Sequence, residues 1–179
     1  MGKGARIWAG LVLACLTLAA CYETAPGVLG RGADVALSSG IYRCENDKDS
    51  QVSIASISAA AQLAPDDVVY VATMEKSRYL VRIAAMADGL FLLEGRDDYR
   101  RAYHLFARRQ GNDGYELLVA DSAGARARLT ALAGAHGVAI EFPNMGPPRI
   151  AGTPQSERAF LMAHTPTELQ RVSTCRLVP

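Results

Sequence analysis

Short runs of strand-forming residues, separated by turn residues, fill the middle of this 179-residue chain. The runs are rich in Val, Leu, Ile, Phe and Tyr, begin 8–13 residues apart, and cover 68–73, 79–85, 90–94, 102–107 and 115–120. This spacing is typical of antiparallel sheets whose strands are joined by short turns. The sequence therefore predicts a mainly β fold, an antiparallel meander that forms a small barrel or sandwich.

A weak internal repeat indicates that the unit of this meander is a hairpin. Residues 79–93 and 103–118 share a pattern of two apolar runs around an Asp-Gly pair, Asp88-Gly89 and Asp113-Gly114 respectively. Asp-Gly favours a tight hairpin turn in which both residues have positive φ. A fainter third copy covers 128–142, whereas the Ala, Leu and Arg content of 123–135 would also permit a helix. We favour strands there.

After residue 142, the spacing of the apolar residues no longer follows the strand pattern. Residues 143–154 are rich in Pro and Gly and predict a surface loop, and 156–164 are amphipathic enough for a short helix. Thr165-Pro166-Thr167-Glu168 has the capping Thr, the Pro and the Glu of a helix start, so a second short helix is expected as far as Arg171. A final strand-like segment contains Cys175.

The first 21 residues have the pattern of an export signal. Lys3 and Arg6 precede an uncharged, mostly apolar run of 14 residues, Ile7–Ala20. The run is too short to span a bilayer, which takes about 20 residues, and it has the length of a secretory signal core. It ends in Leu18-Ala19-Ala20-Cys21, which resembles the lipobox of bacterial lipoproteins.

This resemblance implies that residues 1–20 are removed as a signal peptide and that Cys21 carries the lipid, which makes the membrane a partner through the anchor. Tyr22 stands where an Asp would retain an enteric-type lipoprotein in the inner membrane. The expected location is therefore the outer membrane, facing the periplasm, with the cell surface or inner membrane as alternatives. Residues 21–39 are small and polar, which predicts a flexible lipidated tether, and 40–179 form a single β-rich domain.

Only Cys44 and Cys175 then remain for pairing, because Cys15 leaves with the signal peptide. An oxidising periplasm favours a disulfide between them. They lie 131 residues apart, near the two ends of the domain. Closing so long a loop stabilises a fold by up to about 5 kcal/mol in the chain-entropy model. We predict a disulfide that joins the first strand of the domain to its C-terminal segment.

Charge and motifs exclude several functions. Without Lys3 and Arg6 the chain has 17 basic and 18 acidic residues, and this near-neutral balance argues against nucleic-acid binding, which needs a basic field. His104, His136 and His164 each have a local explanation and no second ligand nearby: His104 lies on a strand with a wet, basic face, His136 in a turn, and His164 at a helix end. We predict no catalytic residue, no metal site and no cofactor.

One group of residues suggests binding. A basic and aromatic patch is expected around one hairpin, composed of Arg96, Tyr99, Arg100, Arg101, Tyr103, Arg108 and Arg109. Such a patch would suit an envelope protein, an acidic partner or a glycan. The alternative is a solvated sheet face whose charges offset nearby acids.

The sequence thus predicts a non-enzymatic lipoprotein of the cell envelope that acts as a binding or structural module. Two alternatives remain. The segments Tyr42-Arg43-Cys44 and Cys175-Arg176-Leu177 are similar to the disulfide-closed ends of lipoprotein inhibitors of c-type lysozyme, which implies inhibition of a hydrolase. The other alternative is a periplasmic hydrolase with unrecognised geometry.

Overall fold

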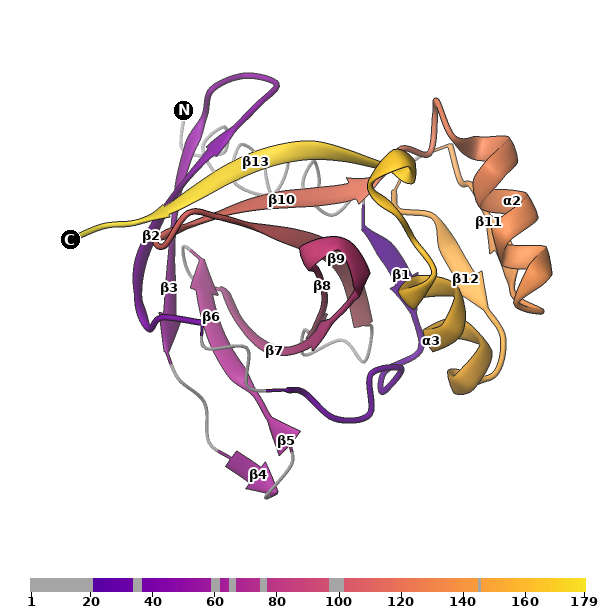
Figure 1. The fold of residues 1–179 in the computed structure, drawn as a ribbon, viewed down its shortest axis with the longest axis horizontal. Coiled ribbons are helices and arrows are strands. Elements are labelled where there is room, and N and C mark those ends of the chain that lie inside the picture. Colours follow the sequence, from indigo (N-terminus) through magenta and orange to yellow (C-terminus); the bar gives the residue numbers. More distant parts are fainter. Residues whose placement is uncertain are drawn as a thin grey trace, which may run out of the picture.

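The computed structural model describes residues 21–33, 37–58, 62–64, 67–74, 77–96, 102–144 and 146–179. In this part of the chain, eight strands form a closed antiparallel barrel (Figure 1). They are β2 (Gly40–Asn46), β3 (Val52–Ser58), β6 (Tyr70–Met74), β7 (Ser77–Ala85), β8 (Leu90–Arg96), β9 (Ala102–Gln110), β10 (Gly114–Ala120) and β13 (Leu169–Leu177). Each pairs with the next along the chain, and β13 closes the ring by pairing with both β10 and β2. The predicted meander is confirmed, and it closes as a barrel.

The predicted disulfide is confirmed and lies at the closing seam of the barrel. Cys44 on β2 is directly opposite Cys175 on β13 in the antiparallel register. Their sulfur atoms are 2.04 Å apart, and the bond joins positions 131 residues apart in sequence. The disulfide therefore ties the first strand of the barrel to the last.

The two hairpin turns of the internal repeat differ in geometry. Asp88 and Gly89 lie in the turn η1 (Ala87–Gly89) and have φ of 56° and 70°, as predicted for an Asp-Gly hairpin. In the second hairpin the prediction is wrong, because the left-handed position is Gly111, with φ of 62°. Gly114 there pairs with Gln110 at the start of β10. The turn thus uses the three residues before Gly114 in place of the Asp-Gly pair.

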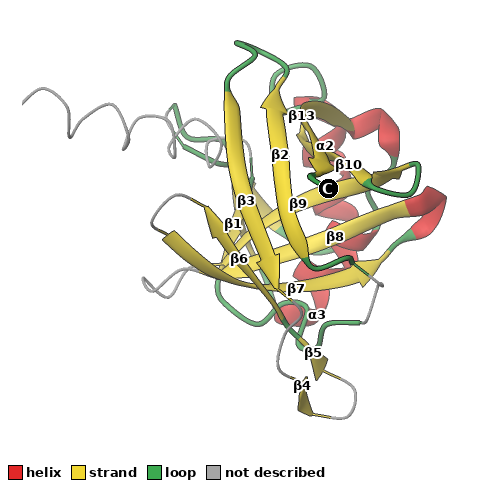
Figure 2. Ribbon diagram, turned by 90° about the vertical axis from the view of Figure 1, so that its left-hand side faces the viewer, coloured by secondary structure: helices red, strands yellow, loops and turns green. Residues whose placement is uncertain are grey.

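A second layer covers the outer face of β8, β9 and β10 (Figures 1 and 2). It consists of β1 (Tyr22–Thr24), α2 (Arg126–Ala135), β11 (Ala139–Glu141), β12 (Arg149–Ala151) and α3 (Pro154–Met162). β1 pairs antiparallel with the first residues of β9 and parallel with β12, which pairs in turn with β11. The chain between β10 and β13 therefore leaves the barrel, builds this layer and returns.

The main hydrophobic core lies between the barrel wall and the second layer. Leu90 and Leu92 of β8 and Phe106 of β9 are at most 1% exposed, and they pack with Leu129 of α2 and Phe160 of α3. Both faces of β8, β9 and β10 carry apolar residues, and the outer face also holds the buried Glu94, His104 and Glu116, so the outer face needs cover. The outer face of β2 and β3, by contrast, is exposed, and it includes the large apolar side chains Ile41, Val52 and Ile54.

Residues 126–135 form helix α2, so the strands favoured for this region are wrong. Leu129 and Ala133, one helical turn apart, are both buried. Ala, Leu and Arg are among the strongest helix formers, and the second layer offers this one face a core to pack against. The later part of the expected third hairpin does form a strand, β11.

The predicted C-terminal helix is confirmed as α3. Thr153 caps it by accepting a hydrogen bond from the Ser156 amide at 3.1 Å, and Pro154 is its first residue. The second expected helix is shorter than predicted: η2 (Pro166–Glu168) is a single 3₁₀ turn with its own capping box. The strand β13 begins immediately after it, at Leu169.

The described part of residues 21–39 is not the flexible tether that the sequence predicted. Tyr22 is 1% exposed, Val28 4% and Leu29 0%, and all three belong to the main core. The physical reason is an edge on the barrel. β10 pairs with β9 only from Phe106 onward, and the free edge of residues 102–104 is taken by β1. A composition rich in small residues gives no sign of such an edge.

A small two-stranded ribbon, β4 (Gln62–Ala64) and β5 (Asp67–Val68), follows β3. The Asp67 carboxylate accepts hydrogen bonds from the Gly32 amide at 2.9 Å and from the Arg82 guanidinium at 2.9 and 3.0 Å. These bonds lower the pKa of Asp67 to about 2. The ribbon is thereby tied both to the N-terminal segment and to the barrel wall.

Candidate functional site: the lumen of the barrel

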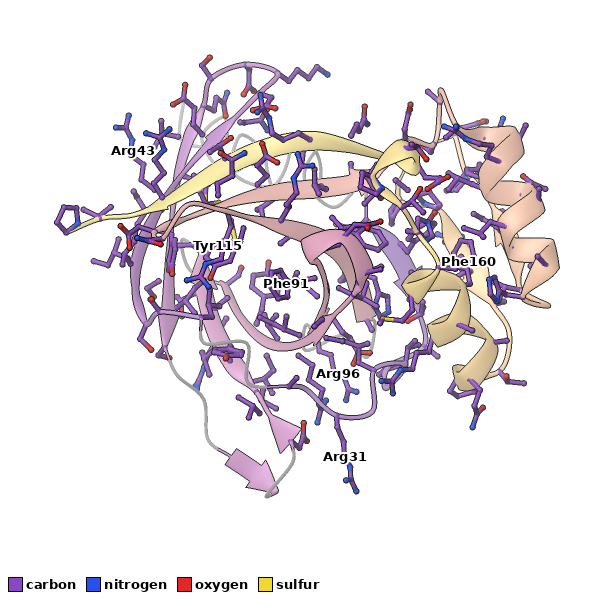
Figure 3. All side chains as sticks on the ribbon, in the orientation of Figure 1. Arg31, Arg43, Phe91, Arg96, Tyr115 and Phe160 are labelled. Carbon is purple, nitrogen blue, oxygen red and sulfur yellow. A yellow bond between two sulfur atoms is a disulfide. The ribbon has the colours of Figure 1, made fainter. Side chains whose placement is uncertain are left out.

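Two labelled side chains define which faces of the strands point into the barrel. Phe91 of β8 and Tyr115 of β10 lie inside the ring, whereas Phe160 lies outside it between α3 and the wall (Figure 3). Directly paired residues of neighbouring strands have their side chains on the same face. Phe91 pairs with Ala107, which pairs with Leu117, so the register extends the inward face around the whole ring.

Many inward-facing side chains are apolar and partly exposed, whereas Tyr70, Ile83 and Ala107 on the same face are at most 4% exposed. The partly exposed side chains include Ile57, Ala72, Met74, Tyr79, Val81, Phe91, Leu93, Tyr103, Leu105, Tyr115 and Leu117. The outward-facing Leu90, Leu92, Phe106 and Leu118 of the same sheet are buried. Partly exposed apolar side chains on the inner face are surface that a ligand could cover, so we take the lumen as the candidate site.

Small residues occupy some positions of the inner face. Gly95 faces inward, because it pairs with Val81 and Tyr103. The nearest atom to a Cβ added at Gly95 would be the carbonyl oxygen of Tyr103, at 4.0 Å. Ala72 and Ala107 hold further inward positions, and Ala107 is 4% exposed. An eight-stranded barrel is wide enough either for its own side chains or for one small ligand.

One part of the lumen is closed by a smaller core around the disulfide. Tyr42, Cys44, Ala55 and Cys175 are at most 7% exposed and pack together. The hydroxyl of Tyr42 donates a hydrogen bond to the Ser38 carbonyl at 2.9 Å. The rings of Tyr42 and Tyr115 are 6.2 Å apart, so this core reaches the tyrosine at the end of the apolar lining.

Burial and neighbouring groups at the disulfide end of the barrel shift the pKa of Tyr42. The pKa of its hydroxyl is raised chiefly by burial, and also by Tyr115 and the Asp113 carboxylate, while Arg109 lowers it. Arg109 faces inward near this end of the barrel, because it pairs with the inward-facing Tyr115. The apolar lumen therefore has a polar rim composed of Tyr42, Arg109, Asp113 and Tyr115, which we call the tyrosine rim.

The structure does not bring the predicted basic patch together on one face. Arg96 points away from the lumen (Figure 3) and donates to the Glu94 carboxylate at 2.9 and 3.0 Å. Arg108 also lies on the outer face and donates to Glu116 at 2.7 and 2.9 Å. The other described members, Tyr103 and Arg109, are on the inward register. Tyr99, Arg100 and Arg101 lie outside the described residues.

Residue alternation causes this separation. Positions 108 and 109 are adjacent on β9, and successive side chains of a strand point to opposite faces of the sheet. Clustering in sequence therefore could not predict a shared surface. Sequence reasoning also missed the lumen lining. The sequence did contain one signal for this lining: β8, β9 and β10 have apolar residues on both faces, and Gly95 interrupts the inward face of β8.

The histidines lie away from the lumen. His104 is fully buried on the outer face of β9, so the wet face predicted for it is wrong. Its Nε2 is 2.8 Å from the Thr24 hydroxyl, and His164 Nε2 is 2.9 Å from the Tyr22 hydroxyl. His104 therefore holds β1 against β9 of the barrel, and His164 holds it against the segment that follows α3. His136, expected in a turn, is the C-terminal cap of α2.

Among the described residues, no group of three or more His, Cys, Asp or Glu side chains is placed to hold a metal ion. No helix in the described ranges is both long and apolar enough to cross a membrane.

Comparison with known proteins found no matching family model, no matching curated protein and no matching solved structure.

Proposed function

We propose that this protein is a non-enzymatic binding module of the cell envelope, attached to the membrane by a lipid on Cys21, whose barrel lumen holds a small and largely apolar ligand. The observation that carries the proposal is the partial exposure of the inward-facing apolar side chains, from Phe91 and Leu93 on β8 to Leu117 on β10. Covering accessible apolar surface of this kind with a ligand is favourable, by about 25 cal/mol for each Å² removed from water.

The composition of the lumen supports binding of an intact ligand. Ligand sites are mostly concave and apolar, with a few polar groups that fix the orientation of the ligand. Here the tyrosine rim supplies those polar groups at one end of the apolar lining. The buried histidines His104 and His164 are on the opposite side of the wall and are engaged by Thr24 and Tyr22.

The N-terminal segment supports a short connection to the membrane. Cys21 is adjacent to β1 and only 5% exposed, Tyr22–Thr24 pairs with β9, and Glu23 pairs with β12. A lipid on Cys21 would therefore hold the barrel and its second layer close to the bilayer, because the residues that come after Cys21 are fixed to the fold. The signal-peptide pattern and Tyr22 favour the outer membrane.

The anchor is tested by mass spectrometry of protein isolated from its own membranes. The expected result is a chain that starts at residue 21 with a diacylglyceryl group and an acylated amine on Cys21. A chain with its initiating Met, or an unmodified residue 21, would contradict the anchor and leave the lumen proposal untouched.

Binding is tested with an uncharged fluorescent polyene, whose emission rises in apolar surroundings. The full chain carrying Cys21→Ser, which removes the lipid site, is expected to bind it with one site per barrel. Gly95→Leu should weaken binding at least about tenfold, because the new side chain fills the lumen at a position with open space; tenfold corresponds to about 1.4 kcal/mol.

The matched control is Gly134→Leu on the exposed side of α2, where an added Cβ also meets nothing within 4 Å. It should leave binding unchanged. Equal binding by the Gly95→Leu and Gly134→Leu variants, both folded by circular dichroism, would remove the lumen as the site.

A further inference from the structure

An N-terminal strap, which we define as residues 21–33, crosses the outer side of the barrel wall from β9 to β7 (Figure 1). Three of its residues form β1 and pair within the sheet. Farther along, the Leu29 amide donates a hydrogen bond to the buried Glu94 carboxylate of β8 at 2.8 Å, and the Ala33 amide donates to the Ile83 carbonyl of β7 at 2.8 Å. The eight strands of the barrel pair with one another around the ring without the strap.

Two buried imidazoles hold the β1 part of the strap through its side chains. His104 Nε2 lies 2.8 Å from the Thr24 hydroxyl, and His164 Nε2 lies 2.9 Å from the Tyr22 hydroxyl. Both histidines are at most 4% exposed. Each of the two buried side chains of β1 is therefore bonded to an imidazole.

The surroundings of His104 suit a neutral ring. The Thr24 hydroxyl donates to the Ala25 carbonyl at 2.6 Å, so it accepts from His104 Nε2, and the lone pair of the ring lies on Nδ1. This Nδ1 is buried and has no hydrogen-bond partner among the described residues, so a proton added there would be a buried donor with no acceptor in place. Two charged groups of β8 face the ring: Glu94, whose oxygens already accept from the strap and from Arg96, favours the added proton, and Arg96 opposes it.

His164 is also placed as a neutral ring. Its Nδ1 lies 3.0 Å from the Phe160 carbonyl, which can only accept, so Nδ1 donates there and Nε2 accepts from the Tyr22 hydroxyl. A second ring proton would therefore point at the proton of that hydroxyl. Of the other titratable groups near the ring, Glu168 of η2 favours the added proton, and His136 at the end of α2 opposes it.

We propose that the N-terminal strap is an acid-sensitive switch: protonation of His104 and His164 in mild acid detaches it while the eight-stranded barrel stays closed. The barrel is held independently, because its strands pair around the ring and the Cys44–Cys175 bond crosses its seam. Release would uncover the edge of β9 that β1 now occupies. On the lipid-anchored form proposed above it would also turn a fixed connection to the membrane into a flexible one, although release itself does not depend on the anchor.

Proton linkage gives the size of the effect. A histidine in contact with water binds its proton near pH 6.5, whereas burial lowers the pKa of each of these two rings to about 4. The detached state therefore binds more protons between these values and gains population as the pH falls. From pH 7 to pH 5, that population should rise by up to about twentyfold for each histidine and roughly 500-fold for both.

The test is hydrogen–deuterium exchange of the full chain, followed by mass spectrometry at pH 7 and pH 5 and corrected for the intrinsic pH dependence of exchange. Peptides from residues 22–33 should be at least about tenfold less protected at pH 5 than at pH 7. At pH 5 they should also be at least about tenfold less protected than peptides from β2 and β13. Equal protection of strap and barrel at pH 5 would show a single cooperative unit and would overturn the proposal, as would strap protection that is the same at both pH values.

Variants identify the trigger. Combining His104→Gln with His164→Gln should leave strap protection within about threefold between pH 7 and pH 5, because neither position then titrates. His136→Gln is the matched control, since this histidine caps α2 through its backbone amide, and it should keep the pH effect of at least about tenfold.

Circular dichroism checks that each variant is folded. If the double variant does not fold, the two single variants decide, because each should keep only the part of the pH effect that comes from the other histidine, up to about twentyfold. A folded double variant that still loses strap protection tenfold in acid, or single variants that both keep the full wild-type effect, would show another trigger and overturn the proposal.

Discussion

At the scale of single residues, two buried histidines connect the N-terminal segment to the rest of the fold, His104 to β9 and His164 to the segment after α3. His104 is 0% and His164 4% exposed. Burial lowers the pKa of each to about 4. For His104, the Glu94 carboxylate opposes this shift and Arg96 adds to it. For His164, hydrogen bonds to the Phe160 and Leu161 backbone oppose it, as does Glu168.

These pKa values predict a loss of stability in mild acid. In the unfolded chain a histidine binds its proton near pH 6.5, whereas in the folded protein His104 and His164 do so only near pH 4. Between these values the unfolded state binds more protons, so the free energy of unfolding falls as pH falls from about 6.5 to about 4 and levels off below. Each histidine accounts for up to about 3 kcal/mol of this fall.

Urea unfolding across this pH range measures the effect. Replacing both residues with Gln should lower stability at pH 7 and flatten the slope between pH 6.5 and 4. A wild-type protein with the same stability at pH 7 and pH 4.5 would contradict this account of the two histidines.

At the scale of elements, the short strand β1 decides how the N-terminal segment behaves. Its Glu23 amide donates a hydrogen bond to the Pro148 carbonyl at 2.9 Å, next to β12. Its side chain lies 3.9 Å from Arg149, half of whose side chain is exposed. The backbone hydrogen bond therefore contributes more to stability than the surface ion pair, because exposed pairs contribute at most about 1 kcal/mol.

Glu23→Pro tests whether residues 22–24 are a strand or a tether. Proline removes the amide donor, and we expect a loss of about 2 kcal/mol or more in the free energy of unfolding. Glu23→Ala keeps the amide and should cost less than about 1 kcal/mol. Denaturant unfolding of the two variants gives the comparison; equal stabilities would support the flexible tether that the sequence predicted.

At the scale of the whole molecule, the barrel depends on a seam between its first and last strands. Between β2 and β13 in sequence lie the other six strands of the barrel and, apart from β1, the whole second layer. The Cys44–Cys175 bond crosses this seam on the lumen side. It therefore links the stability of the fold to the redox state of its surroundings.

Replacing Cys44 and Cys175 with Ser should lower the free energy of unfolding by about 2–5 kcal/mol, because the unfolded chain regains the freedom of a 131-residue loop. The measurement is urea unfolding with and without dithiothreitol. Reductant should destabilise the wild type and leave the double variant unchanged. A wild type whose unfolding midpoint does not respond to complete reduction would contradict this role of the bond.

The sequence by itself determined the features that depend on local patterns. Alternating and continuous apolar runs indicated the strands, Asp88-Gly89 the first hairpin turn, and the amphipathic pattern of 156–164 the region of α3. The two remaining cysteines indicated the disulfide. Each of these depends on residues close together in sequence, or on a pairing with no competitor.

Other features depend on which face of a strand or helix packs against its neighbours, and these were set by the tertiary packing. It placed Tyr22–Thr24 on an edge that exists only because β10 leaves β9 early, and it selected the helix at 126–135 because a core lies beside it. It also put Arg108 outside and Arg109 on the lumen side. The side-chain period of a strand is two residues, so the orientation of every such residue depends on the closed register of the barrel.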